Sequence, residues 1–220
     1  MAESRSADKR RYRGMDGPER EAARREQLIE AGLELFGTAG YAATTVENVS
    51  RRAQLAKKYF YESFADREAL LITIYRAEIT KAQEAVVLAL SQAGPTIEER
   101  AAAGLSALIR TLGADPRVTR LVFREIIRVA TPTTEALYEQ AKHDFGEFII
   151  GVVTETLNVP RTKRLQMGAT VLVGAVNELM TDWILGEMDA TVDEIVEISS
   201  TLFNVVYQQY VRELSEGKHI

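Results

Sequence analysis

Hydrophobic residues recur every three to four positions along most of the chain, which is the period of a helix with one buried face. No stretch alternates apolar and polar residues over the length of a strand, so we predict an all-α fold. The breaks in the pattern contain glycine or proline, residues that end helices. These breaks separate about nine expected helices, at residues 20–39, 45–52, 56–62, 67–91, 96–113, 116–130, 133–157, 162–187 and 191–215.

Short polar side chains precede several of these helices, where they can accept a hydrogen bond from a free backbone N–H. Thr44 and Glu47 have the spacing of a capping box, in which each side chain bonds the other residue's backbone. Asp66 is placed to cap the long helix that follows it. Further N-caps are expected at Thr96, Asp115, Thr131, Thr162 and Thr191.

Composition excludes several classes of protein. The chain has 220 residues, 46% hydrophobic and 27% charged, enough for one compact domain or two small ones. It has no cysteine, which removes disulfides, thiolate catalysis and most zinc sites. His143 and His219 are far apart in the sequence, so we expect no metal site and no cofactor. The chain also lacks a hydrolase elbow, a phosphate loop and a dinucleotide fingerprint, so we expect no enzyme and no catalytic residues.

The chain is not expected to enter a membrane. Its longest uninterrupted apolar run, Ala85–Leu90, is far too short to span a bilayer. The basic N-terminus lacks the apolar region of a secretion signal. We therefore expect a cytoplasmic protein with no membrane partner.

The net charge of −5 is unevenly distributed. Residues 1–67 hold thirteen lysines and arginines against eleven acidic residues, whereas the remainder holds fourteen against twenty-one. A basic end on an acidic body suits a DNA-binding domain on a soluble sensor, because phosphate contacts are local while solubility depends on the whole surface.

The N-terminal third has the organisation of a helix-turn-helix. Two short helices follow a longer one, whose apolar face is expected to hold Leu28, Gly32, Leu35, Phe36 and Ala39. On the second short helix, Phe60 and Phe64 are expected to point inward. Its other face carries lysines and hydroxyl groups, which bind phosphates and base edges. Without further information, a plain helical bundle with a solvated lysine pair explains the same pattern equally well.

Residues 25–71 decide between these alternatives, because they resemble the N-terminal signature of the TetR family. The segment LFGTAGYAATTVENVSRRAQLAKKYFYESFADREALL follows the family pattern L-F-x-x-x-G-Y-x-x-T-T-V through to F-Y-x-x-F-x-x-[KR]-E-x-L-[LI]. The resemblance implies that Tyr61 and Arg67 hold phosphates and that Lys58 and Tyr59 lie closest to the bases. The full set of expected DNA contacts is Thr44, Thr45, Arg52, Lys57, Lys58, Tyr59, Tyr61, Ser63 and Arg67.

The turn departs from the family pattern. Gln54 and Ala56 stand where the family usually has glycine and serine. Because alanine has no side-chain acceptor, the helix that follows is expected to lose a cap worth about 1 kcal/mol. Any phosphate contact from a cap hydroxyl is lost with it.

The resemblance implies three segments. Residues 1–19 are expected to form a flexible basic tail, residues 20–66 the helix-turn-helix DNA-binding domain, and residues 67–220 a larger helical domain for ligand sensing and dimerisation. The tail could reach along the DNA as an arm or could serve only solubility. Its cations are Arg5, Lys9, Arg10, Arg11 and Arg13.

The last two helices carry long apolar stripes and further apolar residues beside them, so they need a second packing partner. The resemblance implies a homodimer in which this pair forms a four-helix interface. We expect that interface to include Leu172, Val176, Leu179, Trp183, Leu202, Val206 and Tyr210. Small residues such as Gly168 and Gly174 would permit close helix approach.

A ligand cavity among the middle helices is likewise expected by analogy with the family. Apolar and polar candidates for its wall are Phe123, Tyr138, His143, Phe145, Phe148, Asn177, Glu178 and Trp183. For each polar candidate, a surface position or a satisfied place in the core is the more ordinary explanation. An arginine row at residues 117, 120, 124 and 128 is typical of a solvated face.

These expectations favour a sequence-specific repressor that binds a palindromic operator in double-stranded DNA and is released by an unknown small-molecule effector. The alternative is a DNA-binding architectural or protein-recruiting factor, or an activator, without such an effector. A solid core in the second domain would favour the alternative.

Overall fold

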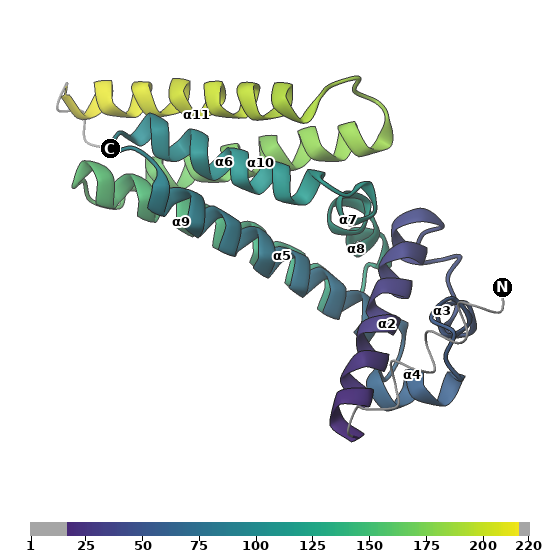
Figure 1. The fold of residues 1–220 in the computed structure, drawn as a ribbon. Coiled ribbons are helices and arrows are strands. Elements are labelled where there is room, and N and C mark those ends of the chain that lie inside the picture. Colours follow the sequence, from purple (N-terminus) through teal and green to yellow (C-terminus); the bar gives the residue numbers. More distant parts are fainter. Residues whose placement is uncertain (1–16, 216–220) are drawn as a thin grey trace. The chain divides into compact units, whose positions relative to one another are not determined.

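The computed structural model describes residues 17–215, and over these residues the chain is helical throughout, without strands. Nine helical segments result if the contiguous α7, η1 and α8 are counted together, which confirms the predicted all-α fold (Figure 1). The expected basic tail lies outside these residues, except that residues 17–19 form the first turn of α2. The elements are α2 (Gly17–Thr38), α3 (Val46–Arg52), α4 (Lys57–Ser63), α5 (Arg67–Gln92), α6 (Ile97–Gly113), α7 (Pro116–Arg120), η1 (Leu121–Glu125), α8 (Ile126–Val129), α9 (Pro132–Leu157), α10 (Lys163–Leu185) and α11 (Val192–Ser215).

Most of the predicted helix starts are confirmed by their caps. The hydroxyls of Thr96, Thr131 and Thr162 each accept from the backbone N–H three residues on, and Asp66 accepts from Ala69 at 2.8 Å. The predicted cap at Thr44 is wrong. Thr45 has the extended backbone of an N-cap, and its hydroxyl accepts from the N–H of Asn48 at 3.1 Å.

The chain divides into two compact units, the N-terminal unit ending at Ile74 and the C-terminal unit beginning at Tyr75, within α5. In the N-terminal unit, α3 and α4 pack against α2 and against each other (Figure 1). The core is built on Leu28 and Phe36 from α2, Val49 from α3 and Phe60 from α4, all fully buried. Leu35 is only half-buried and Ala39 is exposed, because the chain leaves the helix after Thr38.

Gly32 lets α2 approach α5 closely within the N-terminal unit. A Cβ at this position would lie 2.8 Å from Leu70 Cδ2 and 3.0 Å from Ile74 Cδ1. We expect Gly32→Leu to destabilise the N-terminal unit by about 1–3 kcal/mol, the usual cost of overpacking a core.

Chemical denaturation followed by circular dichroism measures this change. The matched control is Gly146→Leu on α9, where a Cβ would meet no atom within 4 Å. The control should be neutral or stabilising by up to about 1 kcal/mol, because leucine favours helix over glycine. Equal destabilisation of both variants would show that the close approach at Gly32 is unimportant.

In the C-terminal unit, α6, α9, α10 and α11 pack side by side (Figure 1). Between α7 and α8 the backbone forms a π-turn, η1, where the sequence predicted an unbroken α-helix over residues 116–130. Residues five apart become neighbours in a π-turn. Accordingly, Arg120 Nε lies 3.2 Å from the buried carboxylate of Glu125. Phe123 lies within this turn.

No helix within residues 17–215 is both long and apolar enough to cross a membrane.

Candidate nucleic-acid interface and interior cavity

The turn between α3 and α4 has the tight geometry of a helix-turn-helix. Gln54 has a φ of 57°, in the left-handed region that glycine adopts most easily. Ala56 is the N-cap of α4 and makes no side-chain cap hydrogen bond, as predicted. The two departures from the family pattern therefore lie at the two positions where the backbone would benefit most from glycine and serine.

The face of α4 that points away from the N-terminal core carries Lys57, Lys58 and Tyr61. All three are exposed, Tyr61 by 55%, whereas Phe60 between them is fully buried. The Lys57 ammonium lies 6.0 Å from the centre of the Tyr61 ring. A short helix therefore presents two cations and a phenol to solvent.

Tyr59 differs from this exposed set. It is half-buried, with the Arg24 guanidinium 4.5 Å and the Lys58 ammonium 4.8 Å from its ring centre. Arg24 belongs to α2, so its contact with Tyr59 connects α4 to the supporting helix. Arg24 and Lys58 also place two cations beside the Tyr59 ring. Ser63, at the end of α4, is half-buried.

The other expected DNA contacts lie at or near α3. Thr44 is buried, and its hydroxyl donates to the carbonyl of Gly40 at 2.8 Å, so we remove it from the expected DNA contacts. Thr45 is exposed at the N-terminus of α3. Arg52 is exposed, and its Nε donates to Glu34 Oε1 at 2.7 Å.

Arg67 holds the loop between α2 and α3. Its Nη1 donates to the carbonyl of Tyr41 at 3.1 Å and to that of Thr44, and its guanidinium lies 4.7 Å from the centre of the Tyr41 ring. These contacts give it a structural role that the sequence did not suggest. Its predicted contact with a phosphate stays a prediction.

We expect Arg67→Lys to destabilise the N-terminal unit by about 1–3 kcal/mol, because lysine keeps the charge but cannot donate to both part-buried carbonyls as the guanidinium does. Denaturation in urea, followed by circular dichroism, measures the loss. If Arg67 only supplied charge to a phosphate, the variant would be as stable as the natural protein and would bind DNA equally well.

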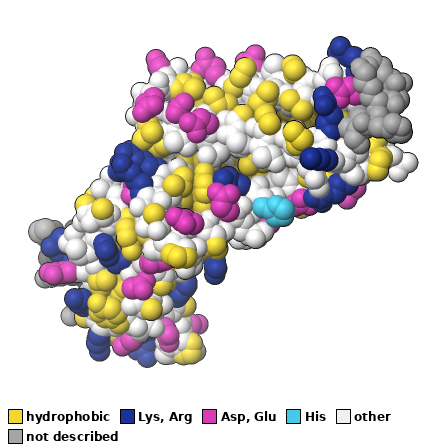
Figure 2. Space-filling model, turned by 180° about the vertical axis from the view of Figure 1, so that it is seen from behind, with side chains coloured by type: hydrophobic (Ala, Val, Ile, Leu, Met, Phe, Trp, Pro, Cys, Tyr) yellow, Lys and Arg dark blue, Asp and Glu magenta, His cyan; other side chains and the backbone are white. Residues whose placement is uncertain are grey.

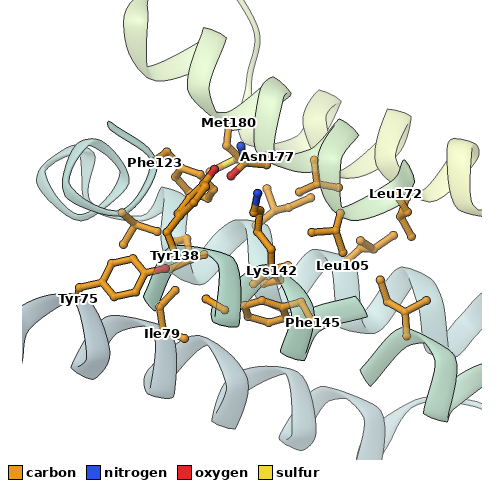
Figure 3. A pocket seen from close by; sticks show the side chains of 18 residues that line it. Tyr75, Ile79, Leu105, Phe123, Tyr138, Lys142, Phe145, Leu172, Asn177 and Met180 are labelled. Atoms are coloured by element: carbon orange, nitrogen blue, oxygen red, sulfur yellow. The ribbon is translucent and has the colours of Figure 1, made fainter. Parts of the chain in front are cut away.

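The C-terminal unit contains an interior cavity of about 80 Å³ among α5, α6, η1, α9 and α10. Its wall is almost entirely apolar (Figure 3). The residues that line it are Tyr75, Ile79, Leu105, Leu108, Ile109, Leu112, Val122, Phe123, Tyr138, Ala141, Lys142, Phe145, Ile149, Leu172, Val173, Val176, Asn177 and Met180.

Three polar groups gather at one part of this wall, the Tyr138 hydroxyl, the Lys142 ammonium and the Asn177 amide (Figure 3). Burial raises the pKa of Tyr138, although its hydrogen bond with Asn177 opposes the shift. The phenol is therefore protonated at neutral pH. Lys142 lies 4.7 Å from the Tyr138 ring centre and pairs with Glu139 at 2.7 Å. A few converging polar groups in an apolar cavity are typical of a small-molecule site.

Four of the expected ligand-binding residues, Phe123, Tyr138, Phe145 and Asn177, line the cavity, and their contact with a ligand stays a prediction. The other four candidates do not line it, because their helix faces point elsewhere. His143 and Glu178 are exposed, and Phe148 is not part of the wall. Trp183 instead closes the turn between α10 and α11, where its Nε1 donates to the carbonyl of Ala190 at 2.9 Å. The sequence analysis missed Lys142, although its spacing of four residues from Tyr138 places both on one helix face.

The predicted dimer residues fall into two groups. Leu172, Val176 and Tyr210 are buried inside the C-terminal unit, whereas Leu179, Trp183, Leu202 and Val206 are half-buried. The apolar side chains that are more than half exposed on α10 and α11 are others, Met167 (60%), Val171 (58%), Ile198 (53%) and Val205 (64%). We refer to these four residues as the α10–α11 face. Hydrophobic side chains gather on the side of the C-terminal unit that Figure 2 shows.

Residues 17–215 contain no group of three or more histidine, aspartate or glutamate side chains placed to hold a metal ion.

The geometry of α3, the turn and α4 defines a helix-turn-helix DNA-binding protein. Residues 28–74 match the family described as bacterial regulatory proteins, tetR family. The fold and this match support a TetR-family transcriptional regulator, as predicted from the sequence.

Individual relatives agree with this assignment. The fatty acid metabolism regulator protein of Bacillus subtilis is 19% identical over 82% of this chain and 92% of that protein. The HTH-type transcriptional regulator BetI of Rhizobium meliloti is 33% identical over 41% of this chain and 42% of its own length. Among solved structures, FadR from Bacillus subtilis in complex with stearoyl-CoA has a TM-score of 0.70 at 17% identity, over 82% of this chain and 96% of that chain.

Proposed function

We propose that this regulator is a homodimeric repressor, which binds a palindromic operator and is released by a small-molecule ligand. The observation that carries the proposal is the combination of a cationic recognition helix in one unit with an apolar cavity in the other. The N-terminal domain, residues 20–66, would bind DNA, and the remainder would sense ligand and dimerise. Such a protein acts on the chromosome, so we propose a cytoplasmic location.

DNA binding is supported by α4. Its lysines supply charge to phosphates, and its hydroxyl groups can donate to phosphate oxygens or base edges. The protein as a whole is acidic, with a net charge of −5, so non-specific attraction to DNA is weak. Affinity must therefore come from the N-terminal unit.

Dimerisation is supported by the α10–α11 face. Exposed valine, isoleucine and methionine side chains on two neighbouring helices form a surface that a second copy of the chain can bury. A two-fold axis through this face would relate two recognition helices, which matches the symmetry of a palindromic operator.

Release by ligand is supported by the size and the wall of the cavity. At about 80 Å³ it is smaller than the roughly 300–1,000 Å³ of ordinary ligand pockets. A ligand of ordinary size can therefore bind only when wall residues are displaced. Its binding would favour a conformation of the C-terminal unit in which the cavity is larger. Tyr75 and Ile79 in the wall belong to α5, whose first turns are part of the N-terminal unit. Displacing α5 would therefore act on the DNA-binding unit through a continuous helix.

Selection of bound duplexes from a random pool tests the DNA-binding part of the proposal. Recovery of a palindrome whose half-sites lie about one helical turn apart is the expected result. Binding without a sequence motif, sensitive only to salt, would contradict it. Recovery of a palindrome that no small molecule releases would favour the alternative, an architectural or recruiting factor or an activator without an effector.

Substitutions in α4 separate the proposed roles of its residues. We expect Lys57→Ala and Tyr61→Phe to weaken binding to every DNA sequence, because their partners are phosphates. We expect Tyr59→Ala to change the sequence preference, with a loss of about 1–3 kcal/mol at the positions it contacts. Fluorescence anisotropy with cognate and scrambled duplexes measures both effects. An equal loss on both duplexes for Tyr59→Ala would contradict its role in base recognition.

A further inference from the structure

A second hollow lies beside the cavity, and the two share part of their walls. It is a groove of about 860 Å³ among the C-terminal part of α9, the N-terminal part of α10 and the C-terminal part of α11. Ile149 of α9 and Leu172 of α10 line both the cavity and the groove. These two aliphatic side chains belong to both walls, and we call them the partition.

The groove continues the line of the cavity along α9. Residues of this helix that face the two hollows run from Tyr138, through Phe145 and Ile149, to Val153. Fifteen residues of helix span about 22 Å. The two hollows together therefore form a long, narrow site.

The chemistry of the wall changes along this line. At the Tyr138 end, a phenol, an amide and the Lys142 ammonium converge (Figure 3). In the groove, the wall towards α9 and α11 is formed by Val153, Leu165, Ala169 and Phe203. The charged residues of the groove, Lys163, Arg164 and Glu213, lie at the first turn of α10 and the end of α11, where Arg164 donates to Glu213 at 2.6 Å. The Tyr138 end suits an anionic group that accepts hydrogen bonds, and the apolar part of the groove suits an apolar chain.

We infer that the cavity and the groove are two segments of one elongated site, and that its ligand is an amphiphile with an anionic head and a long unbranched apolar chain. The head lies at Tyr138, Lys142 and Asn177, and the chain passes between Ile149 and Leu172 into the groove. This inference rests on the proposed function, in which the cavity is the ligand site.

Two features specify the ligand further. The Lys142 side chain is 34% exposed, so the site for the head group opens to solvent. The head group can therefore be a free carboxylate, or it can be a thioester that joins the apolar chain to a larger anionic group in solvent. Met167, Val171 and Val205 line the groove and also belong to the α10–α11 face. A second copy of the chain bound there would cover the groove and shield the apolar chain from water.

The experiment compares octanoate, hexadecanoate and hexadecanoyl-CoA as probes, by displacement of a fluorescent fatty acid from the full-length protein. Each additional buried methylene should tighten binding about fourfold. We expect hexadecanoate to bind at least 100-fold more tightly than octanoate. Comparing the affinities of hexadecanoate and hexadecanoyl-CoA shows whether the site prefers a free carboxylate or a larger anionic head group.

Variants locate the chain within the groove. Ala169 is buried and lines only the groove, so Ala169→Leu should weaken hexadecanoate at least tenfold and leave octanoate within twofold. Leu172→Phe, which enlarges a side chain common to both walls, should weaken hexadecanoate at least tenfold. The matched control on the same helix is Gly174→Ala, where a Cβ would meet no atom within 4 Å. Lys142→Met should weaken both acids equally, and a cationic amphiphile of the same length should not bind.

Each outcome decides something. Equal affinity for the short and the long acid, or equal loss of both in Ala169→Leu, would overturn the elongated site but leave the cavity as a ligand site. Absence of binding by any of the probes, with operator binding intact, would overturn this inference and the ligand chemistry assigned to the cavity, but not the DNA-binding function. Binding of the long acid that Lys142→Met does not weaken would place the head elsewhere and overturn the orientation.

Discussion

Replacing Phe60 by alanine is expected to destabilise the N-terminal unit by about 3–5 kcal/mol, the usual cost of removing a fully buried phenylalanine. Phe60 is 0% exposed, and its ring centre lies 5.8 Å from that of Phe64 and 5.6 Å from that of Tyr61. It is the side chain through which α4 is held to the core. Because whole domains are stable by only about 5–15 kcal/mol, a loss of this size removes much of the stability of a small unit.

The consequence for function follows from the position of α4. With α4 detached, the lysines and tyrosines it carries lose their common orientation, and operator affinity should fall at least 100-fold. Amide hydrogen exchange, which reports stability segment by segment, should show lost protection in residues 17–74 and normal protection in α9 and α10. The matched control is Tyr61→Ala, one residue away and 55% exposed. It should weaken DNA binding but change stability by no more than about 0.5 kcal/mol. Equal destabilisation by both variants would contradict this account of the core.

The second large effect concerns the α10–α11 face. We expect the double substitution Val171→Asp and Val205→Asp to yield a monomer whose operator affinity is at least 100-fold lower. In a symmetric dimer each substitution occurs twice, so four carboxylates would be transferred from water into an apolar interface. One recognition helix alone binds only half of a palindrome. Sedimentation velocity gives the mass, and anisotropy with the operator duplex gives the affinity.

The matched control for the dimer face is Val87→Asp on α5. Val87 is 58% exposed, like Val171, but lies on a different helix. This variant should remain dimeric and bind the operator normally. A double variant of α10 and α11 that stays dimeric would show that the second copy binds elsewhere.

Much of the fold could be predicted from the sequence, because its signals are local. A threonine or aspartate followed by a helical pattern is sufficient to place the starts of α6, α9 and α10. The error at α3 has the same origin. Thr44 and Thr45 have identical side chains, and only the packing of the loop decides which one is buried and which one caps.

The outer and inner faces of α10 could not be predicted in the same way. Val171 and Leu172 are adjacent and both apolar, yet one is 58% exposed and the other 3%. A stripe that packs inside one chain has the same period as a stripe that packs between two chains. The side chains expected in the dimer interface were therefore partly those of the interior.

The composition of the cavity wall could be predicted only in part, because contacts between helices far apart in the sequence are not visible in the hydrophobic pattern. Phe123, Tyr138 and Phe145 could be proposed as apolar residues of the middle helices, and the spacing of Lys142 from Tyr138 was a usable signal, but Tyr75 could not be assigned to the same site. The sequence contains one signal of the π-turn, a pair of opposite charges five residues apart. In an ordinary α-helix Arg120 and Glu125 would lie on different faces, and here they meet.

We expect this protein to recognise a specific DNA sequence as a dimer. The most direct test is a titration of the selected palindrome and a scrambled duplex with the full-length protein, followed by anisotropy at about 150 mM salt, where non-specific binding is weak. We expect two chains per duplex and an affinity for the palindrome at least 10³-fold higher than for the scrambled duplex, the lower end of the usual specificity range. Equal affinity for both duplexes, or one chain per duplex at saturation, would contradict it.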